Sequence, residues 1–215
     1  MSQHTLTLLR FTYKKLKEKL TVSDSKKLFH EKFPYVIPGL YKKIVDEMIV
    51  ALNLLNHQNE FILQYLFSIG LTETFQELTK GYKPEKHLDL LFESICSSTN
   101  FEAKEIKEIS QKTQDEFKDK SSKEILKLLK EKSSSKLYSS RLLNLGIYIL
   151  ISYSQDFKGE NESKMNKTII EIFEKLNLST NKAEKDIGIY KSVITKMEQA
   201  KELIEELRIK DKKKQ

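Results

Sequence analysis

The sequence predicts an all-α fold, a single multi-helix bundle with a long C-terminal helix of coiled-coil character. Charged residues make up 32% of the 215 residues, whereas only 6 are Gly and 3 are Pro, so few of the turn signals that an all-β fold needs are present. Apolar residues recur at steps of three and four along most of the chain, as on one face of an α-helix. A hydrophobic content of 39% is enough for one helical core and leaves little for a second globular domain.

The first predicted element is a basic amphipathic arm at residues 1–20. Its leucines and one tyrosine follow helical spacing, with basic residues between them. Two interpretations stay open for this arm: an interfacial contact with a membrane, or a segment that packs loosely on the body of the protein.

A helical bundle domain is predicted for residues 21–178. Ser23 is the expected N-cap of its first helix, because a Ser hydroxyl accepts a hydrogen bond from a free backbone amide. Pro38 starts the next helix, and Gly81 follows the third helix in the position of a C-terminal cap.

The second half of the bundle contains a polar helix and a very apolar one. Residues 101–120 have sparse apolar positions, which predicts a helix that lies on the surface. Ser121 and Glu124 then have the spacing of a capping box, in which the two side chains bond each other's backbone amides. Residues 137–153 form the most apolar stretch, and we expect this helix to be central to the bundle.

The last predicted element, at residues 179–215, is a coiled-coil-like helix with a basic tail. Its apolar residues form a narrow heptad seam of Tyr190, Val193, Met197, Ala200, Ile204 and Leu207. The seam spans fewer than three heptads, so it either packs back on the body or contacts a partner, and the oligomeric state stays open. We expect Met197→Lys combined with Ile204→Lys to remove a partner contact and to spare the core.

The net charge of +7 is carried by the two ends of the chain. Residues 1–20 contribute +4 and residues 210–215 contribute +3, so residues 21–209 are neutral overall. Nucleic-acid-binding folds usually concentrate positive charge on a docking face, and Arg occurs only at positions 10, 141 and 208. We therefore expect no nucleic acid partner. The basic ends either contact anionic lipid or act as solubilising tails.

The sequence carries no recognisable catalytic, cofactor-binding or metal-binding motif. The four His lie outside metal-ligand spacing of one another and of Cys96. His30 and Glu31 begin like a zinc-protease motif, but Pro34 stands where the second His is needed. The Gly residues never cluster, so no phosphate-binding loop is available. The sequence favours a non-enzymatic protein without cofactors, in which Cys96 is a buried core residue.

The cellular setting follows from cysteine usage and hydropathy. A single Cys rules out an internal disulfide and favours a reducing compartment, here the cytoplasm. The longest uncharged stretch, at residues 142–155, is shorter than the roughly 20 apolar residues that span a bilayer. We expect it to be a core helix rather than a membrane span.

Short motifs occur in order along nearly the whole chain. They include Thr21 to Lys27, Phe33-Pro34, Ile37-Pro38, Tyr41 to Glu47, Leu66 to Gly70, Gly81 to Glu85, Ile95-Cys96, Tyr138 to Gly146, Lys185-Asp186 and Lys196 to Ala200. In these motifs the chain resembles the thylakoid formation family, also called the photosystem II biogenesis proteins. No transit peptide precedes Thr21, so the resemblance is to the cyanobacterial form.

The sequence departs from the family at Lys42 and Lys43, where the family usually has two Arg. This exchange keeps the charge but loses a bidentate donor. Lys42 and Lys43 are therefore candidates for a charged surface that contacts a carboxylate on a partner.

The resemblance implies a role at photosynthetic membranes. Members of the family support thylakoid biogenesis, photosystem II assembly or repair, and the level of FtsH-type membrane proteases. We therefore expect a cytoplasmic protein, peripherally associated with the thylakoid membrane, whose partners are photosystem II assembly proteins or FtsH-type proteases. The alternative is a soluble scaffold or signalling adaptor that docks through its C-terminal coiled coil.

Overall fold

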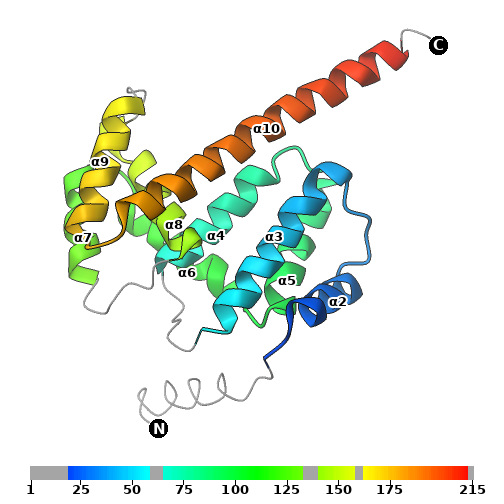
Figure 1. Cartoon of the computed structure of the whole chain (residues 1–215), viewed down its shortest axis with the longest axis horizontal. Coiled ribbons are helices and arrows are strands. Elements are labelled where there is room, and N and C mark those ends of the chain that lie inside the picture. The colour runs from blue at the N-terminus through cyan, green and yellow to red at the C-terminus, as the bar shows by residue number, and fades with distance from the viewer. Residues whose placement is uncertain (1–18, 59–64, 133–139, 158–161, 213–215) are drawn as a thin grey trace.

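The computed structural model describes residues 19–58, 65–132, 140–157 and 162–212, and these residues form an all-α bundle (Figure 1). The α-helices are α2 (Val22–Lys32), α3 (Gly39–Asn56), α4 (Tyr65–Leu78), α5 (Leu88–Ser98), α6 (Ala103–Phe117), α7 (Ser122–Lys132), α8 (Arg141–Ser152), α9 (Glu162–Lys175) and α10 (Thr180–Lys212). Two short 3-10 helices, η1 (Glu85–His87) and η2 (Gln155–Phe157), precede α5 and follow α8. The predicted all-α fold with a long C-terminal helix is confirmed, and the coiled-coil character of that helix stays a prediction. The arm at residues 1–18 lies outside the described residues.

Side chains that bond free backbone amides fix the starts of α2 and α7. Thr21 caps α2 in a capping box with Asp24, whose amide nitrogen lies 3.1 Å from the Thr21 hydroxyl. The prediction of Ser23 as the N-cap is therefore wrong, because only Thr21 has an acidic partner three residues ahead. The predicted box at Ser121 is confirmed, since its amide nitrogen lies 2.8 Å from a Glu124 carboxylate oxygen.

The buried side chains form two clusters that share helix α4. One cluster lies among α2, α3 and α5 and takes Phe67, Leu71 and Phe75 from α4. The other lies among α7, α8 and α9 and takes Leu66 and Ile69 from α4. Helix α8 is central, as the sequence predicts, and most of its residues are buried. Helix α4 therefore joins the two halves of the core through its opposite faces.

Helices α4 and α8 approach each other closely at two glycines. A Cβ atom on Gly70 would lie 1.9 Å from the carbonyl oxygen of Leu142. A Cβ atom on Gly146 would lie 2.0 Å from the carbonyl oxygen of Leu66. Gly70 faces Leu142, one turn before Gly146, and Gly146 faces Leu66, one turn before Gly70. The two helices therefore run antiparallel, and their backbones are in contact. Only glycine fits at either position.

The remaining helices cover this central pair. Helix α6 packs on α4 through Ile106, Ser110 and Thr113 and leaves its opposite face exposed, which agrees with the predicted surface helix. Helix α10 begins at Thr180 and packs its first half against α8, α9 and α4, while its second half extends beyond the bundle (Figure 1). Within the described ranges, none of the helices combines the length and apolar character of a membrane span.

The glycine contact makes a stability prediction. Gly70→Ala and Gly146→Ala each force two backbones apart, so we expect the free energy of unfolding to fall by about 2 kcal/mol or more. The gain in helix propensity, about 1 kcal/mol, offsets only part of this loss. Chemical denaturation monitored by circular dichroism measures the effect.

Gly188→Ala in α10 is the matched control, because nothing lies within 4 Å of the added Cβ atom. This variant is expected to gain roughly 0.5 to 1 kcal/mol from helix propensity alone. Equal stability of Gly70→Ala and Gly188→Ala would show that α4 and α8 do not touch through their backbones.

Cys96 generates a second prediction. Its side chain is fully buried in the core, as the sequence predicts, and burial raises the pKa of the thiol to about 12. The thiolate is the reactive form, so at pH 8 we expect iodoacetamide to leave the folded protein unmodified. Alkylation measured by mass spectrometry is expected only after unfolding in guanidinium. Rapid labelling of the native protein would place Cys96 at the surface.

Candidate functional site

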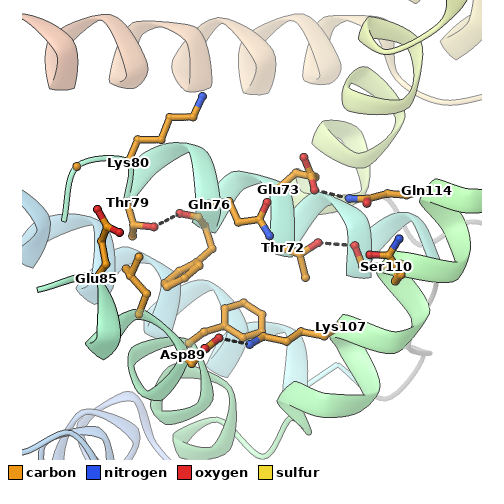
Figure 2. A pocket seen from close by; sticks show the side chains of 15 residues that line it. Thr72, Glu73, Gln76, Thr79, Lys80, Glu85, Asp89, Lys107, Ser110 and Gln114 are labelled. Atoms are coloured by element: carbon orange, nitrogen blue, oxygen red, sulfur yellow. Dashed lines mark hydrogen bonds and ion pairs between the residues drawn. The ribbon is translucent and has the colours of Figure 1, made fainter. Parts of the chain in front are cut away.

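A polar groove with a volume of about 630 Å³ lies between α4, α5 and α6. Figure 2 shows the labelled side chains that line it: Thr72, Glu73, Gln76, Thr79, Lys80, Glu85, Asp89, Lys107, Ser110 and Gln114. The described lining residues include no His and no Cys. Across the described part of the chain, no three His, Cys, Asp or Glu residues are grouped as a metal site requires.

Several polar side chains of the groove bond to one another across its three helices. The Thr72 and Ser110 hydroxyl oxygens are 2.5 Å apart, which joins α4 to α6. The Lys107 ammonium lies 2.8 Å from Asp89 and 5.3 Å from the centre of the Phe92 ring, which joins α6 to α5 (Figure 2). These contacts hold the three helices α4, α5 and α6 together.

Tyr153 lies beside the groove and contacts Glu73, one of its lining residues. It donates a hydrogen bond of 3.0 Å to Glu73, which also accepts one from Gln114. Burial and the Glu73 carboxylate raise the pKa of Tyr153 to about 12. The hydroxyl therefore stays protonated at neutral pH and is not suited to act as a base or a nucleophile.

The heptad seam of α10 is divided between the core and the solvent. Tyr190 and Met197 are each only 7% exposed, and Val193 packs beside them as a half-buried residue. Ile204 and Leu207 are 39% and 51% exposed. The first part of the seam packs back on the body, and the second part is uncovered.

The expectation that Met197→Lys spares the core is therefore wrong. Met197 belongs to the same buried cluster as Tyr41 and Phe75, so a lysine there would bring a charge into the core. Ala200 lies at the transition, where its side chain is half-buried. The regular spacing of the seam does not indicate at which residue the body of the protein stops covering it.

The uncovered part of α10 carries what we call the distal strip: Leu203, Ile204 and Leu207. At 3.6 residues per turn these three side chains fall within an arc of about 100° on the helix. Leu203 lies outside the heptad pattern and was therefore not predicted as part of the surface. The helical spacing of Leu203, Ile204 and Leu207 could have indicated it. Figure 1 shows this end of α10 projecting away from the other helices.

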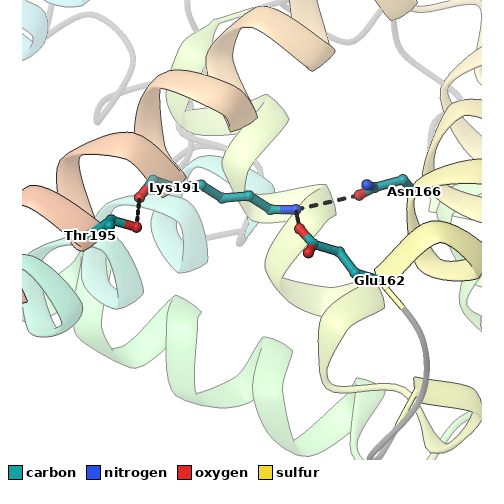
Figure 3. Close-up of polar contacts among 4 residues, drawn as sticks. All are labelled: Glu162, Asn166, Lys191 and Thr195. Atoms are coloured by element: carbon teal, nitrogen blue, oxygen red, sulfur yellow. Dashed lines mark hydrogen bonds and ion pairs between the residues drawn. The ribbon is translucent and has the colours of Figure 1, made fainter.

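Polar contacts anchor the first half of α10. The Lys191 ammonium lies 2.7 Å from a Glu162 carboxylate oxygen and 3.4 Å from the side-chain oxygen of Asn166, both on α9 (Figure 3). The Lys191 ammonium lowers the pKa of Glu162. On the other side, Asn144 of α8 donates a hydrogen bond of 2.8 Å to Asp186. Helix α10 is thus held to both α8 and α9 before it leaves the bundle.

The two lysines singled out by the sequence lie on α3, far along the chain from the seam. Lys43 is 88% exposed and lies 3.9 Å from Glu47, one helical turn ahead. Lys42 is also exposed and borders a cleft of about 360 Å³ that includes Phe33 and Tyr35. Both ammonium groups lie on an accessible surface, and their role in binding a carboxylate stays a prediction.

Comparison with known proteins gives a consistent result over the whole fold. The chain matches the family described as thylakoid formation protein over residues 21–215. It is 80% identical over 199 residues to Protein Thf1 of Prochlorococcus marinus strain MIT 9312, covering 93% of this chain and 99% of that protein. It is 71% identical to Protein Thf1 of Prochlorococcus marinus subsp. pastoris, covering 92% and 98% of the two chains.

A solved structure supports the same assignment. The structure of Psb29 superimposes with a TM-score of 0.79 at 25% sequence identity, covering 91% of this chain and 98% of that one. The family match begins at Thr21, the residue that caps α2, and continues to the end of the chain. The resemblance found in the sequence motifs is therefore confirmed, and the chain belongs to the thylakoid formation protein family.

Proposed function

We propose that the protein is a non-enzymatic factor in thylakoid membrane biogenesis and in photosystem II assembly or repair, and that it acts by binding other proteins. Family membership supports the biological setting. The distal strip carries the proposal of binding, because its three large apolar side chains are exposed on a helix that the body holds in place. Exposed apolar residues at helical spacing are typical of surfaces that receive a second helix.

The charges beside the distal strip indicate the kind of partner. Glu202, Glu205 and Glu206 are exposed on the same two turns of α10. At 3.6 residues per turn, Glu206 lies about 60° from Leu203 on one edge of the distal strip, and Lys201 lies about 60° from Ile204 on the other edge. One acidic and one basic edge fit a partner helix whose edges carry the opposite charges. We propose that this partner belongs to the photosystem II assembly proteins or to the FtsH-type membrane proteases.

A peripheral position at the thylakoid membrane is part of the proposal. Residues 210–214 are mostly Lys, and each basic residue near an anionic surface contributes about 1 kcal/mol of attraction. The basic run begins in the last turn of α10, the helix that carries the distal strip. Helix α10 would therefore bring the distal strip close to membrane-embedded partners from the cytoplasmic side.

The double variant Ile204→Gln, Leu207→Gln tests the binding surface. Each substitution removes about 1 kcal/mol of apolar contact with a partner, so affinity is expected to fall about 30-fold. Both positions are exposed, and stability should stay within about 0.5 kcal/mol of the parent protein. The measurement is co-purification of tagged protein with FtsH-type proteases from native membranes, together with recovery of photosystem II after strong light in a deletion strain.

Ile189→Gln is the matched control, because Ile189 is 38% exposed on the same helix but outside the distal strip. This control should retain the protease and restore recovery. Full recovery with the double variant would place the binding surface elsewhere. Unchanged recovery in the deletion strain itself would contradict the role in photosystem II repair.

Cell fractionation separates the proposal from its alternative, a soluble scaffold that uses the same strip. A membrane-associated fraction that leaves the membrane at high salt is the expected result, since screening weakens the attraction of the basic tail. Protein found only in the soluble fraction, with its partners still bound, would favour the scaffold.

A further inference from the structure

A second hollow, the apolar cavity, lies between α3, α4, α8 and α10 and has a volume of about 230 Å³. Its walls are mainly aliphatic and include Met48, Leu71, Leu142, Leu145 and Val193. The apolar cavity shares no lining residue with the distal strip, which lies further along α10. An apolar hollow of this size is larger than one known to hold benzene, about 150 Å³, and it is suited to an apolar ligand.

One polar side chain in the apolar cavity is unsatisfied. Thr74 of α4 lines the cavity and is 5% exposed, and its hydroxyl has no hydrogen-bond partner within the described structure. Other threonines of this region behave differently, since Thr72 bonds the carbonyl of Ser68 at 3.0 Å and Thr79 bonds that of Phe75 at 2.7 Å. A buried hydroxyl without a partner is unfavourable by about 1 to 3 kcal/mol, so a bound acceptor would stabilise it.

A cation lies at the same end of the apolar cavity. Arg141 is the first residue of α8, lines the cavity and is exposed to solvent. Thr74 lies one turn beyond Gly70 on α4, and Arg141 directly precedes Leu142, the residue that Gly70 touches. The antiparallel crossing therefore brings Thr74 and Arg141 to the same end of the helix pair.

Charges around Arg141 favour an anionic ligand. Among the described residues, no carboxylate forms an ion pair with its guanidinium within 4 Å, whereas Glu47, which also lines the cavity, pairs with Lys43 at 3.9 Å. A guanidinium presents several donors in a plane and suits a carboxylate. The hydroxyl of Thr74 provides a further donor.

We propose that the apolar cavity binds a single-chain anionic amphiphile, with its chain among the aliphatic walls and its carboxylate at Arg141 and Thr74. A volume of 230 Å³ holds about eight groups of methylene size, at about 30 Å³ each. The ligand class is therefore a medium-chain carboxylate, or a longer one whose chain end stays outside. Because α10 forms part of the wall through Val193, the bound ligand would also contact the helix that carries the distal strip.

Isothermal titration with decanoate, decanol and decyltrimethylammonium tests the proposal on the full chain. Decanoate is expected to bind most tightly and to raise the thermal midpoint of unfolding, because it binds only the folded state. Decanol should bind about tenfold more weakly, since it lacks the charge that Arg141 recognises. Decyltrimethylammonium should bind least, because its charge repels Arg141.

Three variants assign the contacts. Arg141→Gln should lower decanoate affinity about tenfold and leave decanol binding unchanged. Thr74→Val should raise the thermal midpoint of the free protein, because it removes an unsatisfied hydroxyl, and should weaken decanoate about fivefold. Ala51→Met fills the apolar cavity from α3 and should weaken both ligands. Lys130→Gln, an exposed cation on α7 outside the cavity, is the matched control and should change nothing.

The results that would contradict ligand binding come from the titration, so they are independent of the co-purification experiment that tests protein binding. Absence of decanoate binding would overturn the proposal. Equal affinity for all three probes, or an Arg141→Gln variant that binds decanoate like the parent protein, would overturn the head-group site. Unchanged binding by Ala51→Met would place the chain outside the apolar cavity.

Discussion

The contact between Gly70 and Gly146 is the constraint on which the rest of the structure depends. It allows α4 and α8 to approach until their backbones touch, and α4 then reaches both buried clusters with opposite faces. A wider separation would move Leu66 and Ile69 away from the cluster that they share with α8. The polar groove and the apolar cavity both have α4 as a wall, so their shapes depend on the same contact.

Local sequence patterns predicted where the helices lie along the chain, but not which helices pack against one another. The capping box at Ser121 and the central apolar helix could be predicted because each depends on a few adjacent residues. Gly146 gave no signal of its role, since one glycine in an apolar run looks like an interruption until its counterpart, 76 positions earlier in the sequence, lies opposite. Met197 shows the same limit, because heptad spacing describes a face of α10 but not what covers it.

The two hollows differ in how their polar atoms are satisfied. In the polar groove, Lys107, Ser110 and Gln114 of α6 each bond a side chain of α4 or α5, so the groove is closed by its own contacts. In the apolar cavity, the Thr74 hydroxyl has no partner among the described residues. Sequence alone predicted neither hollow, since each is assembled from three or four helices. Volume would favour the groove as a ligand site, whereas unsatisfied hydrogen bonding favours the cavity.

The attachment of α10 through Lys191 determines how its far end meets a partner. About 15 residues continue from Met197 to the end of the helix at Lys212, a length of about 22 Å. Because the first half is held by α8 and α9, the direction of this projecting rod is set before any encounter. A partner would then gain its contact without the entropy loss of ordering a flexible segment. The body of the protein would stand off from the partner by roughly the length of the rod, leaving its α3 lysines accessible to a second molecule.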